Sequence, residues 1–355
     1  MTFPVDSRRA AVVGTGLVGG SIGMALRRRG GHVEGSDLEG ARAERARALG
    51  ALDAVGEDRQ AEITFVATPV GAVVEAARAA LKGPGMVTDV GSVKAPVVAG
   101  VDDPRFVGGH PMAGSEQDGL EGADVDLFEG ATWVLTPTRE TDPEAYTAVR
   151  SVVRSLGADV VSLPPDRHDS LVALVSHVPH LVAATLMGMA ADGALEHAAV
   201  LRLAAGGFRD MTRVAAGHPG IWLDICAENR DAIVDGLDGL IAALGTMRNC
   251  VAEGDREGLL ATLERSREAR MNLPGRIERP EELAEVRVPV PDRKGVAAEV
   301  TTLLAELAVN IEDLEIVHSS EGTRGVLVLM VRAESGEAVR AALAARRYRP
   351  SVRHL

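Results

Sequence analysis

The stretch Val12-Val13-Gly14-Thr15-Gly16-Leu17-Val18-Gly19-Gly20-Ser21 decides the fold of the N-terminal part of this 355-residue chain. It continues a short apolar run and matches the GxGxxG pattern, in which a strand turns directly into a helix. We expect Gly14 to make the tight turn, Gly16 to let the backbone approach a pyrophosphate, and Gly19 to let helix and strand pack closely. The N–H groups at the start of the helix then face the phosphates.

An acidic residue, Asp37, follows the second expected strand. Its carboxylate can accept hydrogen bonds from both ribose hydroxyls and repels a 2′-phosphate, which favours NAD over NADP. Arg42 lies close by in sequence and could instead turn toward a 2′-phosphate, and an ordinary glycine-rich turn is the structural alternative. The predicted NAD contacts are Gly14, Thr15, Gly16, Leu17, Val18, Gly19, Asp37, Thr68 and Pro69.

The pattern along the chain predicts three domains. Short β-branched runs alternate with Ala- and Arg-rich stretches over residues 1–165, which predicts a Rossmann-type, doubly wound parallel sheet with helices on both faces. After Pro164-Pro165, residues 166–277 show helical periodicity without convincing strands and predict an all-helical second domain. Residues 285–355 read βαββαβ, which predicts a small ferredoxin-like domain.

Composition and charge exclude several classes of protein. The chain is 46% hydrophobic with a formal net charge of −13, so it is globular, and nucleic acid is not an expected partner. Its two cysteines, Cys226 and Cys250, have no disulfide or metal spacing. The N-terminus lacks the pattern of a signal peptide, and polar residues interrupt the longest apolar stretch, 171–191. We therefore expect a cytoplasmic protein without a membrane span.

Two polar segments follow neighbouring strands, where open α/β sheets bind their ligands. They are Thr88-Asp89-Val90-Gly91-Ser92-Val93-Lys94 and Gly108-Gly109-His110-Pro111-Met112-Ala113-Gly114-Ser115-Glu116. His110 is expected where a nicotinamide ring lies, and a neutral imidazole there can take a proton from a hydroxyl as hydride leaves the substrate. The alternative is a structural histidine that caps a turn.

The helical domain carries two further clusters. Ser176-His177-Val178-Pro179-His180 interrupts an apolar run, which predicts a cleft lining; buried core histidines or a metal pair are the alternatives. Gly206-Gly207-Phe208-Arg209-Asp210-Met211-Thr212-Arg213 suggests an Arg–Asp pair that can also hold a carboxylate, the alternative being a surface ion pair. Trp222 follows, and either walls a substrate pocket or belongs to the core.

These segments together resemble the prephenate and arogenate dehydrogenase family of tyrosine biosynthesis. GTGLVGGS, DVGSVK, GGHPMAGSE, SHVPH and FRDMTR occur in that order within residues 14–213, and the tail from about Val286 resembles an ACT domain. The resemblance covers nearly the whole chain. It implies NAD-dependent oxidative decarboxylation of prephenate to 4-hydroxyphenylpyruvate, a homodimer formed through the helical domain, and L-tyrosine as an effector.

The resemblance also implies roles for individual residues. His110 corresponds to the catalytic histidine that bonds the ring hydroxyl, Ser92 to the serine that orients this histidine and the substrate hydroxyl, and Arg213 to the arginine that binds a substrate carboxylate. The other predicted substrate-binding residues are His180, Ser176, His177, Asp210, Ser115, Glu116, Trp222 and Lys94. The predicted effector residues are Asp292, Gly295 and Asn310.

Three other functions were weighed against this one. Arogenate carries an amino group, which Glu116 could favour, so an arogenate dehydrogenase is the nearest alternative. A 3-hydroxyacid dehydrogenase shares the Rossmann and helical domains but does not account for GGHPMAG and FRDMTR. A non-catalytic sensor of NAD and amino acids leaves His110, Ser92 and Arg213 without a role.

Overall fold

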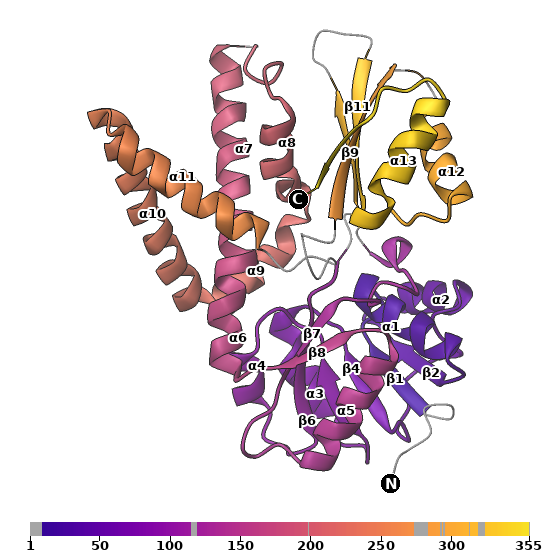
Figure 1. Cartoon of the computed structure of the whole chain (residues 1–355). Helices are drawn as coiled ribbons and strands as arrows, with labels where there is room; N and C mark the ends of the chain where they lie inside the picture. Colours follow the sequence, from indigo (N-terminus) through magenta and orange to yellow (C-terminus); the bar gives the residue numbers. More distant parts are fainter. Residues whose placement is uncertain are drawn as a thin grey trace. The chain divides into compact units, whose positions relative to one another are not determined.

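The chain forms two compact units, Met1–Gly245 and Thr246–Leu355 (Figure 1). The computed structural model describes residues 9–114, 119–197, 199–272, 283–291, 293, 295–311, 313–318 and 324–354.

The first unit is built on a sheet that, over the described residues, has eight strands in the order β3-β2-β1-β4-β5-β6-β7-β8. The strands are β1 (Arg9–Val13), β2 (His32–Ser36), β3 (Ala54–Val55), β4 (Ile63–Val66), β5 (Met86–Asp89), β6 (Phe106–Pro111), β7 (Thr132–Thr136) and β8 (Asp159–Ser162). Strands β2 and β3 are added on one side of β1 and strands β4 to β6 on the other side. This order confirms the Rossmann-type fold.

One strand pair departs from the expected parallel arrangement. β6 and β7 pair antiparallel, whereas the neighbouring pairs from β3 to β6, and the pair β7–β8, are parallel. The reason lies in the connection: the described part of residues 112–131 holds a single short 3-10 turn, Leu120–Gly122, and no crossover helix. Without a crossover helix the chain returns beside β6 in the opposite direction.

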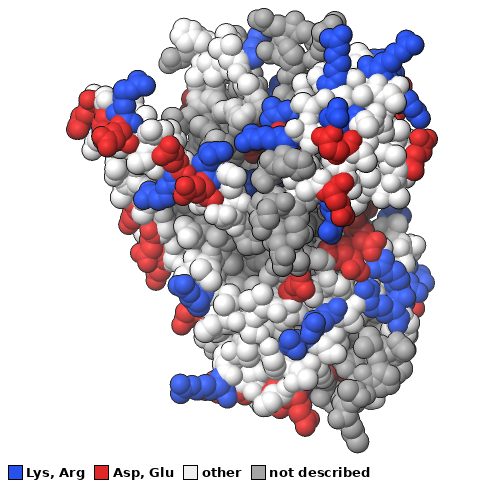
Figure 2. Space-filling view, in the orientation of Figure 1, with Lys and Arg blue, Asp and Glu red and all other residues white. Residues whose placement is uncertain are grey.

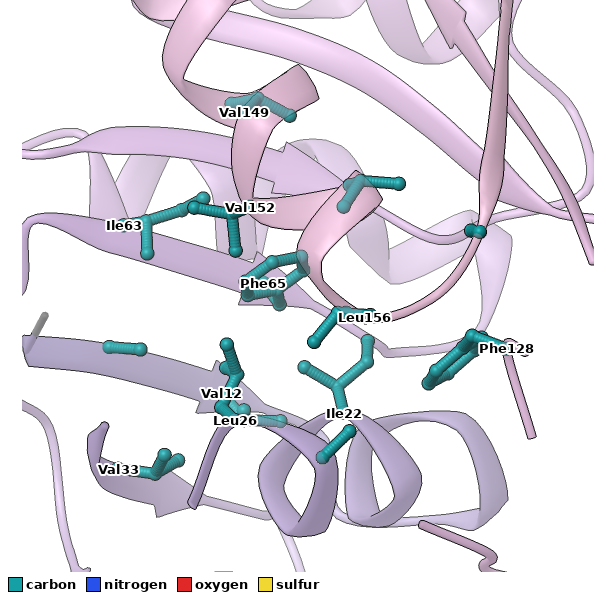
Figure 3. Packing of buried hydrophobic residues seen from close by; sticks show 14 of the residues in the cluster. Val12, Ile22, Leu26, Val33, Ile63, Phe65, Phe128, Val149, Val152 and Leu156 are labelled. Carbon is teal, nitrogen blue, oxygen red and sulfur yellow. The ribbon is translucent and has the colours of Figure 1, made fainter. Parts of the chain in front are cut away.

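Helices cover both faces of this sheet (Figure 1). One face of the sheet is covered by α1 (Leu17–Arg28), α2 (Gly40–Ala48) and α5 (Pro143–Ser155). Figure 3 shows the hydrophobic core between these helices and the sheet. Its side chains include Val12, Ile22, Leu26, Val33, Ile63, Phe65, Phe128, Val149, Val152 and Leu156. α3 (Val70–Ala80) and α4 (Ala95–Gly100) pack on the other face.

The helical part of the first unit packs on the α3–α4 face. Its helices are α6 (Pro165–Val172), α7 (Val178–Glu196), α8 (Gly206–Thr212), α9 (Pro219–Glu228) and α10 (Arg230–Glu253). Ile225 of α9 and Ile233 of α10 share a core with Val70 and Val73 of α3. α9 and α10 are therefore packed against α3, which itself covers one face of the sheet.

α6 runs into α7 through a π-helical turn, Ala173–His177. Pro179 stands in the first turn of α7 and has no N–H to donate to the preceding turn. A widened turn of this kind accommodates the missing hydrogen bond, and such turns occur frequently at functional sites. The turn contains Ser176 and His177 of the SHVPH segment.

The run Pro165–Leu195 is long and apolar enough, by length and composition, to cross a membrane, and 33% of its most apolar window is buried inside the protein. Several large apolar side chains of the helical part remain exposed: Leu174, Val175, Met189, Leu195, Ile241 and Leu244.

The second unit contains α11 (Arg256–Met271) and a βαββαβ domain. That domain is formed by β9 (Leu283–Pro291), α12 (Val296–Glu306), β10 (Asp313–His318), β11 (Arg324–Arg332), α13 (Ala333–Ala345) and β12 (Ser351–His354). Its antiparallel sheet has the order β10-β11-β9-β12, which confirms the expected ferredoxin-like topology. In β9, Val286, Val288 and Val290 alternate inward, and the pairing with β12 ends before Pro289, which has no N–H to donate.

Candidate active site

The phosphate-binding turn has the geometry that each glycine was expected to provide. Gly14 has φ +91°, and a Cβ there would lie 2.4 Å from the carbonyl oxygen of Ala67. A Cβ on Gly19 would lie 1.9 Å from the carbonyl oxygen of Gly14, so α1 packs directly on the turn. No atom from elsewhere in the described chain lies within 4 Å of the position that a Cβ on Gly16 would take, so a pyrophosphate has room beside the backbone there.

Asp37 is held in place at the end of β2. Its Oδ2 accepts hydrogen bonds from the amide and the hydroxyl of Thr15, at 2.8 and 3.1 Å, and its Oδ1 accepts one from the amide of Glu39 at 3.0 Å. Arg42 pairs with Glu39 at 2.7 Å and lies 3.6 Å from Asp37. The guanidinium of Arg42, which could have turned toward a 2′-phosphate, therefore interacts with the carboxylates of Glu39 and Asp37. The turn, the helix N-terminus and this carboxylate together fit NAD.

His110 lies within strand β6, where it pairs with Val134 of β7. The strand runs further than the sequence indicated, so His110 is part of the sheet instead of a turn. Gly109 before it has no space for a side chain, because a Cβ there would lie 2.6 Å from the carbonyl oxygen of Asp89. The close approach of β5 and β6 thus fixes the backbone of His110, whose side chain is only 9% exposed.

A hydrogen-bonded chain runs from His110 into α6. His110 Nδ1 lies 2.9 Å from His168 Nε2, and His168 Nδ1 lies 2.7 Å from Asp169 Oδ1. The carboxylate of Asp169 also accepts hydrogen bonds from the amides of Lys94 and Ala95, at 2.7 and 2.8 Å. α6 is thereby tied to the start of α4 and to the strand that carries His110.

Burial holds the pKa of His110 well below its ordinary value, and His168, Lys94 and His177 lower this pKa further. The imidazole is therefore neutral at neutral pH, as a proton acceptor must be.

The loop that carries Ser92 is joined to the strand of His110 by a buried ion pair. Lys94 is 0% exposed, and its Nζ donates to Asp89 Oδ2 and, at 2.8 Å, to the carbonyl oxygen of Gly109. Asp89 also accepts hydrogen bonds from the amides of Gly91 and Gly109, at 2.9 and 3.0 Å. This placement favours a structural role for Lys94 over the predicted contact with substrate.

The SHVPH cluster is connected to the same network. Asn229, at the end of α9, donates from Nδ2 to the carbonyl oxygen of Asp169 at 3.0 Å and to His177 Nδ1 at 3.2 Å. Burial lowers the pKa of His177 to about 4. Trp222 stacks on His180, with ring centroids 3.5 Å apart, and stands at right angles to His177. Among the described residues no group of three or more His, Cys, Asp or Glu side chains is arranged to hold a metal ion.

Arg213 and Asp210 are exposed, in or next to α8. The segment Arg213–Ala216 packs along α7, and a Cβ on Gly217 just after it would lie 3.8 Å from His180 Cε1. The FRDMTR segment therefore reaches the histidine cluster at the end that carries Arg213.

Not every predicted site residue can be placed. Ser115 and Glu116 lie outside the described residues. Ser92 is half-buried after β5, and the described structure contains no hydrogen bond between it and His110.

The residues that sequence reasoning missed are His168, Asp169, Asn229 and Asp89. A signal for the first two was present: His168 and Asp169 precede Val172 and Ala173 by one helical turn, so the polar pair falls on the apolar, buried face of α6.

A groove of about 880 Å³ lies in the second unit, between β9, α12 and the turn after α13. Gly295, which starts α12 with φ +87°, lines it, together with Arg293, Arg346 and Tyr348. Asn310 is not among the lining residues, and Asp292 lies outside the described residues.

Comparison with known proteins gives matches over most of the chain. Three family models match: the nucleotide-binding domain of prephenate dehydrogenase over residues 22–162, its dimerization domain over 164–265, and the ACT domain over 284–348. A prephenate dehydrogenase of Bacillus subtilis (strain 168) is 34% identical over 333 residues, which are 89% of this chain and 90% of the relative.

Solved structures of related enzymes share the fold. A prephenate dehydrogenase from A. aeolicus, in complex with hydroxyphenyl propionate and NAD+, matches with a TM-score of 0.72 at 30% identity, covering 77% of this chain and 100% of that one. The arogenate dehydrogenase of Synechocystis matches with a TM-score of 0.64 at 33% identity, covering 74% and 98%.

Proposed function

This chain belongs to the prephenate dehydrogenase family, and from that premise we propose how its residues carry out the NAD-dependent oxidative decarboxylation of prephenate to 4-hydroxyphenylpyruvate. The observation that carries the proposal is the buried, neutral imidazole of His110 at the carboxyl end of a sheet whose first turn fits NAD. A single neutral base and accurate positioning are what this reaction requires.

NAD, when bound, accepts the hydride from the ring carbon that carries the hydroxyl. His110 takes the hydroxyl proton at Nε2 as the hydride departs. The bond to the ring carboxylate then breaks, carbon dioxide leaves, and its electron pair makes the ring aromatic. The proton returns from His110 to the phenolate oxygen, so the reaction releases no net proton. Arg213 and His180 bind the substrate, and Arg213 neutralises one of its carboxylates.

Product stoichiometry tests this function. We expect purified enzyme with NAD and prephenate to form NADH, carbon dioxide and 4-hydroxyphenylpyruvate in equal amounts, and none of them when NAD is omitted. Formation of NADH without release of carbon dioxide would show that the ring is oxidised by a different reaction.

Arogenate is the second candidate substrate. The similarity to the Synechocystis arogenate dehydrogenase favours arogenate, since that enzyme is 33% identical and the match covers 74% of this chain. The same base, cofactor and arginine serve either substrate, because the two differ only in the side chain away from the reacting ring.

Replacing Arg213 by Ala is expected to weaken substrate binding. A charge-assisted hydrogen bond contributes roughly 1.5–3 kcal/mol, so KM for prephenate should rise about 10- to 100-fold while kcat changes much less. Steady-state kinetics measure both constants. Arg209→Ala, on the exposed surface of the same segment, is the matched control. A fall in kcat at unchanged KM would transfer the role of Arg213 from binding to chemistry.

Replacing Asp37 by Ala is expected to impair use of NAD. The carboxylate that bonds the ribose hydroxyls is lost, so KM for NAD should rise about tenfold or more, and the preference for NAD over NADP should narrow. Initial rates with each cofactor measure both effects. Glu44→Ala, exposed on α2, is the control. An unchanged KM for NAD would remove Asp37 from the cofactor site.

We further propose that the chain works in the cytoplasm as a homodimer. Its domains would span residues 1–165, 166–277 and 285–355, a division that the three family matches support. The exposed apolar side chains of α7 and α10 supply a surface for association through the helical domain. On the face shown in Figure 2, acidic and basic side chains are interspersed, which is consistent with small-molecule partners over nucleic acid.

L-tyrosine is proposed as an effector of the ACT domain, acting near Gly295 and Asn310. We expect calorimetry on the full enzyme to detect tyrosine binding even when 4-hydroxyphenylpyruvate saturates the active site. Gly295→Asn, which tolerates the positive φ and places a side chain in the groove, should abolish this residual heat and leave kcat unchanged. If saturation with the product removes all tyrosine binding, the amino acid acts only at the active site.

A further inference from the structure

The orientation of the catalytic imidazole can be read from the hydrogen bonds behind it. Asp169 accepts from two backbone amides and from His168, and an ionised carboxylate has no hydrogen to donate. The hydrogen between Asp169 Oδ1 and His168 Nδ1 therefore belongs to His168.

The next bond in the chain follows from the first. A neutral imidazole carries one N–H, so a hydrogen on His168 Nδ1 leaves Nε2 as an acceptor. His168 Nε2 faces His110 Nδ1 at 2.9 Å, with the two rings inclined by 75°. His110 must then donate from Nδ1, which leaves its Nε2 without a hydrogen and able to receive the substrate proton.

We propose that His168 and Asp169 are positioning residues, which hold the imidazole of His110 in the Nδ1–H tautomer and stabilise the imidazolium that forms during the reaction. The inference rests on the proposed function, since it explains how the base of that reaction is kept ready. It also assigns to His168 the orienting task that the family resemblance gave to Ser92, and leaves Ser92 to the substrate hydroxyl.

The burial of this hydrogen-bonded chain of side chains supports the assignment. His168 is 0% and Asp169 5% exposed, so water does not compete for their hydrogen bonds. Two amides at the start of α4 fix the carboxylate, and Asn229 fixes the backbone of Asp169 from the opposite side. Asp169 is held in place and can only accept hydrogen bonds, so it determines the tautomer of His168 and, through His168, that of His110.

The tautomer can be measured directly without substrate. In full-length enzyme labelled with ¹⁵N-histidine, the His110 signals are assigned by their absence from His110→Asn. We expect Nδ1 to be protonated and Nε2 to be bare in the wild type. In His168→Phe the signals should shift toward the Nε2–H form, and kcat should fall about 100-fold while the affinity for NAD is unchanged.

Two further variants separate positioning from general damage. His168→Gln can still accept the hydrogen bond from His110 and should restore the Nδ1–H tautomer and part of kcat. Tyr146→Phe, which removes the 2.6 Å hydrogen bond to Ser162 in the same unit, should change neither signal nor rate. A wild-type His110 with its hydrogen on Nε2 would overturn the proposal, even if His168→Phe does not fold. So would an Nδ1–H form that persists at full kcat in His168→Phe. Because the tautomer is read in the free enzyme, failure to oxidise prephenate would leave this result standing.

Discussion

His110→Asn is expected to lower kcat by about 10²- to 10⁴-fold and to leave the dissociation constants for NAD and prephenate nearly unchanged. The asparagine retains polarity and approximate size, but it cannot take up the hydroxyl proton. Single-turnover rates and equilibrium binding separate the two effects. A variant that binds substrate weakly but turns it over at the normal rate would show that His110 binds substrate and is not the base.

The pH dependence of the reaction follows from the same group. Because burial, and after it the neighbouring His168, Lys94 and His177, lower the pKa of His110, the imidazole stays neutral until the pH falls well below 6.5. The rate should therefore be constant around neutral pH and decline only at a lower pH, as His110 becomes protonated. This acid limb should vanish from the residual activity of His110→Asn, and a limb that persists unchanged would assign it to another group.

Lys94→Met is expected to destabilise the first unit by about 3–5 kcal/mol, because it leaves the carboxylate of Asp89 buried without its cationic partner. The methionine approximates the length of lysine, so the loss reports mainly on charge. Urea unfolding followed by tryptophan fluorescence measures the change, with Trp133 buried in the same unit. Lys82→Met, an exposed lysine after α3, is the control and should change stability by less than about 0.5 kcal/mol.

The double variant Asp89→Asn, Lys94→Met distinguishes the ion pair from packing. Removing both charges should recover part of the stability lost in Lys94→Met, because no unpaired charge remains buried. A loss below about 1 kcal/mol in Lys94→Met would show that the ion pair with Asp89 does not stabilise the first unit.

Much of the fold could be predicted because its signals are local. The short β-branched runs of residues 1–165 predict strands, and β1, β2, β4, β5 and β8 lie at such runs. The antiparallel pairing of β6 with β7 could not be predicted, because it depends on how the chain returns after His110. β3 was also missed, since a strand of two residues carries no periodicity.

The site divides in the same way. The phosphate-binding turn and His110 are marked by glycines, which are required where the backbone has a positive φ or where another segment approaches too closely for a side chain. His168 and Asp169 are marked in the sequence only by their place on the buried face of α6, and Asn229 carries no such mark. Their contacts with His110, with the start of α4 and with α9 join segments that are far apart in the sequence, so these contacts could not be predicted from a local pattern. Lys94 lies in a recognisable segment that suggests substrate binding, whereas the structure places its ammonium in a buried ion pair with Asp89, which favours a structural role.

The most direct test of the central claim is the initial rate of NADH formation by the purified enzyme with NAD, measured separately with prephenate and with arogenate. We expect rapid turnover of prephenate. Preference for arogenate would keep the base, the cofactor and the mechanism and change only the substrate side chain that is recognised. Absence of turnover with either compound, in protein that still binds NAD, would show that this chain does not catalyse the proposed oxidation.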